Sequence, residues 1–195
     1  MKRVFSSLLF AVMLTLSGCN ALQNSLTQAY NLANCEYAYR SISKLSIAGL
    51  NLSEGLSPLM IPRILTILSG NMSSIPLNFT VNMDVKNLSS GAAAFQSFLY
   101  IISIDDVRFT TGNFNQPFHV EAGETKVLPI DIGVDIAEIM QNNSRSAIEK
   151  IVKNFIGLGD TPSKVTIQLK PSFKVGERIV TSPRFIPVDF TFGGK

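Results

Sequence analysis

The sequence has no tryptophan, one histidine and two cysteines among its 195 residues. Without tryptophan, and with four tyrosines, it offers few aromatic platforms on which a bound sugar stacks. Two cysteines cannot build a disulfide framework, and they exclude a zinc site made of cysteines. The single imidazole means that any histidine-based metal site or Ser-His-Asp triad has to be built around His119. The composition therefore argues against carbohydrate-binding, disulfide-stabilised and zinc proteins.

The sequence also lacks a run of like charges. It contains 17 basic and 14 acidic residues, and two of the basic ones, Lys2 and Arg3, lie in the first 18 positions, which hold no acid. Residues 19–195 thus carry 15 basic and 14 acidic side chains. A nearly neutral domain has no electrostatic footprint for nucleic acid, so nucleic acid is not an expected partner.

The N-terminus has the organisation of a bacterial lipoprotein signal. Lys2 and Arg3 precede an apolar run from Phe5 to Leu16, which is shorter than the roughly twenty residues that span a bilayer. A basic flank, a short apolar run and small residues at its end are typical of a secretory signal peptide. The following residues, Leu16-Ser17-Gly18-Cys19, form a lipobox. Residues 1–18 are therefore predicted to be a signal peptide, and Cys19 to carry lipid through its sulfur.

Lipidation at Cys19 predicts where the protein resides. Several acyl chains hold a protein firmly on a membrane, whereas one holds it weakly. Asn20 follows the cysteine, where an aspartate retains enterobacterial lipoproteins in the inner membrane. We therefore expect a lipid-anchored protein of the bacterial cell envelope, in the outer membrane and facing the periplasm, with exposure to the medium as the open alternative.

The remaining 177 residues suit one domain, since a chain of this size buries about 70% of its unfolded surface. Residues 19–34 are predicted to be a helical tether, which either lies on the membrane or packs on the domain. Its apolar stripe comprises Leu22, Leu26, Tyr30 and Ala33. Residues 35–195 form the predicted single domain. Cys35 is expected to be a buried apolar residue, with an intermolecular disulfide as the less favoured alternative.

Alternating apolar and polar residues predict most of the secondary structure after residue 34. Strands are expected over 35–52, 75–87, 95–110, 118–120 and 125–134, and around 165–173 and 186–192. The segment 95–110 is apolar on both faces, which predicts a central strand. Helical spacing predicts one helix over 58–69 and another after Asp135, broken in the polar run 141–146. The predicted fold is a mainly β antiparallel sandwich of about seven strands, immunoglobulin- or fibronectin-III-like, with two interposed helices.

The helix over 58–69 is the segment of greatest functional interest. Ser57-Pro58 predicts its N-terminus, and its apolar residues lie almost all round, which predicts burial on most sides. It is then a plug at one end of the sandwich. Alternatively, it is a lid over an apolar cavity, or a surface for a protein partner. The residues expected to contact a lipid ligand or a partner are Leu59, Ile61, Ile64, Leu65 and Leu68.

Residues 75–135 resemble the late-embryogenesis-abundant type 2 (LEA-2) family, also called the water-stress and hypersensitive-response domain. The resemblance lies in Leu77 to Asn87, in Phe98 to Phe109, and in Pro117 to Ile130. Asp106 stands where the family frequently has glycine. The resemblance implies a single sandwich with a helix, no catalytic machinery, and a role in stress protection or in binding apolar ligands.

Three functional hypotheses follow. The first is a non-catalytic, membrane-tethered envelope lipoprotein that acts as a binding, structural or stress-protective module, with a protein partner in the envelope. The second is a carrier or sensor of an apolar ligand such as a lipid, in a cavity gated by residues 58–69. The remote third is a hydrolase that uses His119. Asp105 and Asp106 are adjacent, so on a strand they point to opposite faces and form no carboxylate pair. No cofactor or metal is expected.

Overall fold

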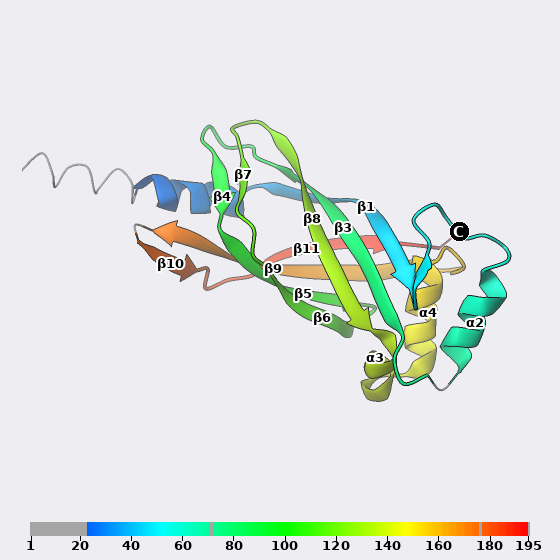
Figure 1. Cartoon of the computed structure of the whole chain (residues 1–195). Helices are drawn as coiled ribbons and strands as arrows, with labels where there is room; N and C mark the ends of the chain where they lie inside the picture. Colours follow the sequence, from blue (N-terminus) through cyan, green and yellow to red (C-terminus); the bar gives the residue numbers. More distant parts are fainter. Residues whose placement is uncertain (1–22, 71, 176, 195) are drawn as a thin grey trace, which may run out of the picture.

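The computed structural model describes residues 23–70, 72–175 and 177–194 (Figure 1). The predicted signal peptide, the lipidation site Cys19 and residues 20–22 lie outside the described residues. A helix over 23–33 comes first. The other helices are α2 (Ile61–Ser69), α3 (Ile136–Asn142) and α4 (Arg145–Phe155). The strands are β1 (Glu36–Ile47), β2 (Leu50–Asn51), β3 (Pro76–Lys86), β4 (Ala93–Phe95), β5 (Ser97–Ile104), β6 (Val107–Phe114), β7 (Phe118–Val120), β8 (Thr125–Asp135), β9 (Ser163–Val175), β10 (Arg178–Thr181) and β11 (Ile186–Phe192).

Of the eleven strands in the described residues, nine form two antiparallel sheets that face each other, and β4 and β7 form a separate antiparallel pair. One has the order β2-β1-β3-β8, and the other has the order β10-β9-β5-β6, with β11 also paired to β9. The sheets meet along one edge where the rings of Tyr39 on β1 and Phe190 on β11 stack 4.4 Å apart. The expected antiparallel β-sandwich is confirmed, and β5 is central in its sheet as predicted. The immunoglobulin-like or fibronectin-like label stays a prediction.

Strict alternation in the sequence places the core. Every second residue of β3 points inward, as does every second residue of β5 on the facing sheet. The inward residues are Leu77, Phe79, Val81, Met83 and Val85 on β3, and Phe98, Tyr100, Ile102 and Ile104 on β5. They belong to one cluster that also includes residues of the helices. The space between the sheets is therefore filled by packed side chains.

The predicted single strand over 95–110 is wrong. The chain turns at Asp105 and Asp106, so that β5 and β6 form a hairpin. Both aspartates have positive φ, 48° and 64°, a conformation that Asp tolerates better than most residues. The positive φ of Asp106 also accounts for the glycine that the LEA-2 family often has there. The two carboxylates lie in a turn and not on opposite faces of a strand.

Three helices close one end of the sandwich, which we call the helical end (Figure 1, right). The predicted break between 141 and 146 is confirmed, because α3 and α4 are separate. Asp135 caps α3 as expected, accepting a hydrogen bond from the Ala137 amide at 2.8 Å. The predicted start of the other helix at Ser57-Pro58 is wrong. Residues 58–60 form a turn, and α2 begins at Ile61 with Pro62 in its first turn, where no amide hydrogen is needed.

The helix over 23–33 packs on the domain at the opposite end, which we call the N-terminal end (Figure 1, left). Leu32 is 1% exposed, and its carbonyl accepts a hydrogen bond from the Tyr37 hydroxyl at 2.8 Å. Asn31 is buried and donates to the Ala92 carbonyl at 3.0 Å. The tether was expected either to lie on the membrane or to pack on the domain, and its described part packs on the domain. No helix among the described residues has the length and apolarity to cross a membrane.

Candidate functional site

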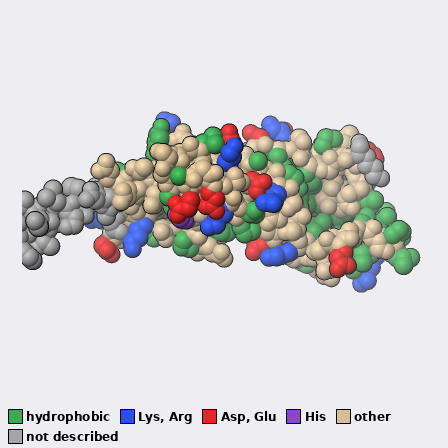
Figure 2. Space-filling model, turned by 90° about the horizontal axis from the view of Figure 1, so that it is seen from above, with side chains coloured by type: hydrophobic (Ala, Val, Ile, Leu, Met, Phe, Trp, Pro, Cys, Tyr) green, Lys and Arg blue, Asp and Glu red, His purple; other side chains and the backbone are tan. Residues whose placement is uncertain are grey.

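The five residues singled out on α2 do not come together. Ile64 and Leu68 are buried in the core, whereas Leu65 is 40% and Leu59 89% exposed, and Ile61 is half-buried. The expected burial of this segment on most sides is wrong, because α2 lies on the end of the sandwich and only one of its faces meets the core. Figure 2 shows the resulting exposed apolar side chains at the helical end. Two of the five residues thus belong to the core, and two face solvent.

Helix α2 is held in place at its C-terminal end. The guanidinium of Arg145 on α4 donates to the carbonyls of Leu68 and Gly70, at 2.8 and 2.9 Å. A hollow of about 490 Å³ lies before the helix, lined by Asn51, Glu54, Gly55, Leu56, Ser57 and Met60. None of the five predicted contact residues lines it. This arrangement favours a plug over a lid for α2.

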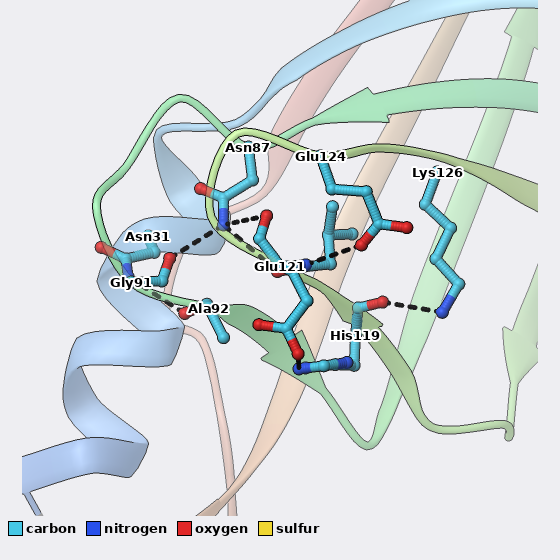
Figure 3. Close-up of polar contacts among 9 residues, drawn as sticks. Asn31, Asn87, Gly91, Ala92, His119, Glu121, Glu124 and Lys126 are labelled. Carbon is cyan, nitrogen blue, oxygen red and sulfur yellow. Dashed lines mark hydrogen bonds and ion pairs between the residues drawn. The ribbon is translucent and has the colours of Figure 1, made fainter.

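His119 lies on the surface, on the short strand β7. Its side chain is 49% exposed, and Nε2 lies 3.2 Å from a carboxylate oxygen of Glu121 (Figures 2 and 3). Its backbone carbonyl accepts a hydrogen bond from Lys126 at 2.9 Å. In the described part of the chain, no three His, Cys, Asp or Glu side chains lie close enough to hold a metal ion. His119 is therefore a partly exposed surface residue of a short strand.

A buried polar network at the helical end ties α4 to the β5–β6 hairpin. Asp105 accepts hydrogen bonds from the Lys164 amide, the Ser163 hydroxyl and the Lys150 ammonium, at 2.9 to 3.1 Å. Partial burial raises the pKa of Asp105, but these hydrogen bonds outweigh burial and hold the pKa below its ordinary value. Asn154 donates to Ser163 from α4. Because Ser163 is fully buried, this network is part of the framework rather than a site open to substrate.

A second buried polar network organises the N-terminal end. The amide nitrogen of Asn87 donates to the carbonyls of Gly91, Val120 and Glu121, at 2.9 to 3.2 Å (Figure 3). Its amide oxygen accepts from the backbone of Ser89, and the side chain is fully buried. Asn87 therefore holds together the two loops that carry the chain into and out of the β4–β7 pair. The helix over 23–33 rests on one of them.

An apolar groove of about 480 Å³ lies between this helix and residues 180–187. Ala29, Tyr30 and Ala33 line it from the helix, and Val180 and Phe185 line it from the other side. Tyr30 is 70%, Val180 49% and Phe185 36% exposed. Soluble proteins seldom expose large apolar side chains side by side without a partner. We therefore take this groove as the candidate functional site.

The short strand β10 adds a second exposed apolar side chain, on the face opposite the one that lines the groove. All of its residues are exposed, and Ile179 is 68% exposed. Sequence reasoning predicted no strand between residues 173 and 186 and missed this exposed strand. The signal was the pair Ile179-Val180, because adjacent residues on a strand point to opposite faces. In a sheet with one buried face, one of them has to be exposed.

The segment that forms one wall of the groove is rich in basic residues. Residues 170–187 contain Lys170, Lys174, Arg178 and Arg184 and one acid, Glu177, while the helix over 23–33 has no charged residue. The Lys170 ammonium lies 5.4 Å from the centre of the Phe185 ring. Outside this segment, residues 19–195 carry 11 basic and 13 acidic side chains. Segment 170–187 therefore carries a formal net charge of +3 in a chain whose other residues from 19 to 195 are slightly acidic.

No protein-family model and no curated protein matches the chain. Solved structures similar to it include a protein from Archaeoglobus fulgidus, with 13% identity, a TM-score of 0.38, and 81% of this chain and 98% of that chain covered. A protein described as late embryogenesis abundant (LEA) has 15% identity and a TM-score of 0.39, over 94% of this chain and 88% of that one.

A third similar structure, from Arabidopsis thaliana, has 11% identity and a TM-score of 0.39, with 80% and 74% covered. At these TM-scores the likenesses carry no conclusion about activity, ligands or partners.

Proposed function

We propose that this protein is a lipid-anchored module of the bacterial cell envelope that acts by binding rather than by catalysis. The lipobox ending at Cys19 supports the anchor. The apolar groove at the N-terminal end supports the binding role and is the observation that carries it. Stress protection of the kind implied by the LEA-2 resemblance is one form of such binding.

The groove suits binding because its walls are held in place before any partner arrives. The helix is fixed by the buried Asn31 and by the Tyr37 hydroxyl, and the opposite wall is continuous with β9 through β10. Contact groups that are already ordered lose little conformational entropy when a partner covers them. Removing exposed apolar surface from water contributes about 25 cal/mol per Å², from which the cost of association is subtracted. A partner with an apolar surface therefore gains free energy at this place.

The anchor is tested on the full chain produced in a bacterial host. Mass spectrometry of the mature protein is expected to find a chain that begins at Cys19 and carries diacylglycerol on its sulfur. The Cys19→Ala variant is expected to lack both the cleavage and the lipid. An unmodified Cys19 in the mature wild-type protein would overturn the anchored part of the proposal.

A carrier of an apolar ligand is the second candidate function. Its ligand would bind in the groove at the N-terminal end and not beside α2. The groove's volume of about 480 Å³ lies within the range of roughly 300–1,000 Å³ usual for small-molecule pockets. Native mass spectrometry of a chain beginning at Asn20 and secreted by its host tests it. If the protein is a carrier, the wild-type chain is expected to show a reproducible excess over the mass of the bare monomer, due to bound ligand. Val180→Asp is expected to abolish this excess, whereas Leu65→Asp, the matched change on α2, is expected to leave it unchanged. A bare monomer mass favours the binding module.

A further inference from the structure

We propose that the N-terminal end makes a second contact with the membrane that does not depend on the lipid on Cys19. In this contact Tyr30, Ile179 and Phe185 enter the interface of an anionic phospholipid bilayer. The basic residues of segment 170–187 contact its phosphate groups. The inference rests on the proposed tethering at Cys19 for its physiological setting, but its test does not require the lipid.

The exposed side chains are of the kinds that membrane interfaces favour. Tyr30 and Phe185 are aromatic, and Ile179 and Val180 add aliphatic surface at the tip of the β9–β10 hairpin. Aromatic rings with one polar end are enriched where bilayer and water meet. This set lies at one end of the molecule, on the helix over 23–33, on β10 and in the segment that follows it (Figure 1). A bilayer that meets this end of the molecule at the tip of the hairpin can therefore contact both faces of β10.

The charge around these residues favours an anionic bilayer over an apolar protein segment. Four basic residues and one acidic residue lie in segment 170–187, although the remainder of residues 19–195 is slightly acidic. Each Lys or Arg near an anionic lipid surface contributes roughly 1 kcal/mol, which is about fivefold in affinity. An apolar peptide gains nothing from this excess of cations. Phosphate headgroups with acyl chains beneath them complement both the charge and the apolar side chains.

The length of the linker places this surface next to the bilayer. Three residues, 20–22, separate Cys19 from the first described residue of the helix. Four Cα-to-Cα steps span at most about 14 Å in any conformation. From residue 23 to Tyr30 the helix adds about 10 Å. Acylation at Cys19 therefore keeps the groove within roughly 25 Å of the lipid, whereas α2 lies at the far end of the sandwich.

The experiment measures vesicle binding by a chain beginning at Asn20, which lacks the lipidated cysteine. Every buried apolar residue of the described structure lies between Leu32 and Phe192, so this chain retains the core. Cosedimentation is compared between vesicles of phosphatidylcholine and vesicles of equal parts phosphatidylcholine and phosphatidylglycerol. We expect preferential binding to the anionic vesicles. Raising the salt from about 0.1 M to about 1 M, which shortens the screening length from roughly 10 to 3 Å, is expected to weaken it.

Two pairs of variants locate the contact. Arg178→Glu is expected to lower binding at least about fivefold, while Arg63→Glu on α2, which makes the same change in net charge, leaves it unchanged. Ile179→Ser is expected to lower binding about tenfold through lost apolar burial. Leu59→Ser removes an even more exposed apolar side chain at the helical end and serves as its control. All four side chains are exposed, so the variants are expected to fold.

Three results would overturn the inference. These are no binding to anionic vesicles, equal losses in Arg178→Glu and Arg63→Glu, and full binding by Ile179→Ser. If vesicle binding fails while mass spectrometry finds lipid on Cys19, the anchored module stands without the second contact. If Cys19 proves to be unmodified while vesicle binding follows the variants as expected, the anchor fails and the surface contact remains.

Discussion

The two ends of the sandwich treat apolar side chains in opposite ways. At the helical end, α2, α3 and α4 close the space between the sheets, and Ile64, Ile136 and Ile148 are fully buried. At the N-terminal end, one helix and a hairpin leave a groove open, with Tyr30 and Ile179 more than two thirds exposed. One end completes the core, and the other presents apolar surface together with positive charge.

The difference between the two ends shows that apolar content alone does not identify a binding surface. Segment 58–69 is more apolar than the segment of strand β10, and it therefore stands out in the sequence. Its helix nevertheless gives Ile64 and Leu68 to the core. Strand β10 contains two aliphatic residues, and both are exposed. What decides the role of an apolar residue is whether the fold places another layer opposite it.

The largest expected effect comes from the buried face of α2. Ile64→Ala is expected to lower the free energy of unfolding by about 2–5 kcal/mol, because it leaves a cavity in the core. Leu65→Ala, the adjacent residue with a 40% exposed side chain, is expected to cost less than about 1 kcal/mol. Urea denaturation of both variants measures the contrast. Equal losses of stability in the two variants would mean that α2 is covered on both faces.

At the N-terminal end, the largest effect is expected from the buried amide of Asn87. Asn87→Ala removes the hydrogen bonds to three carbonyls, of which only that of Glu121 is known to keep a second donor, the Glu124 amide, and is expected to cost about 1–3 kcal/mol. Hydrogen exchange over residues 23–33 is expected to speed up as well, because the loop under this helix loosens. Asn113→Ala, on the exposed side of β6, is the control. Unchanged exchange in Asn87→Ala would show that the helix is held independently of that loop.

A smaller, pH-dependent effect is expected at Asp135. Hydrogen bonds from the Ile75 amide and the Ser74 hydroxyl hold the pKa of this carboxyl below its ordinary value of 3.8, against the effect of partial burial. A lowered folded-state pKa stabilises the protein above the ordinary value, and the stabilisation is lost as the pH falls through the folded-state pKa. Asp135→Ala is therefore expected to cost about 1 kcal/mol at neutral pH.

The cost of Asp135→Ala is expected to shrink as the pH falls below 3.8, because the wild-type carboxylate then becomes protonated. Urea denaturation at several pH values measures the difference between variant and wild type. Asp135→Asn, which keeps one acceptor oxygen, is expected to lose less at neutral pH than Asp135→Ala. A cost that is the same at all pH values would show that the charge of Asp135 contributes nothing.

The smallest effect is expected on β10. Ile179→Ser is expected to change the free energy of unfolding by no more than about 0.5 kcal/mol, because the side chain is 68% exposed. The same change at Ile64 is expected to prevent stable folding. Thermal unfolding of Ile179→Ser checks this. A large loss of stability would mean that the folded chain covers β10, and the surface would then not be free to meet a membrane.

Much of the fold was predictable because it depends on neighbours in the sequence. The alternation over 77–85 places one face of β3 in the core. Asp135 before an apolar helical pattern indicates a cap, and the polar run 141–146 indicates a break. The turn at Asp105 and Asp106 was missed, because an Asp pair is a weaker hairpin signal than Asn-Gly or Asp-Gly. This turn and the start of α2 are errors in the position of one local boundary each.

The candidate site was not predictable in the same way. Tyr30, Val180 and Phe185 are far apart in the sequence, and no local pattern joins them. Most of the strands, the cap of α3 and the charge of segment 170–187 follow from the sequence, since periodicity and composition are local properties. That α2 gives one face to the core and that the N-terminal end keeps a groove follows from the packing of distant segments. The burial of a side chain depends on what packs opposite it, and that is known only once the layers are assembled.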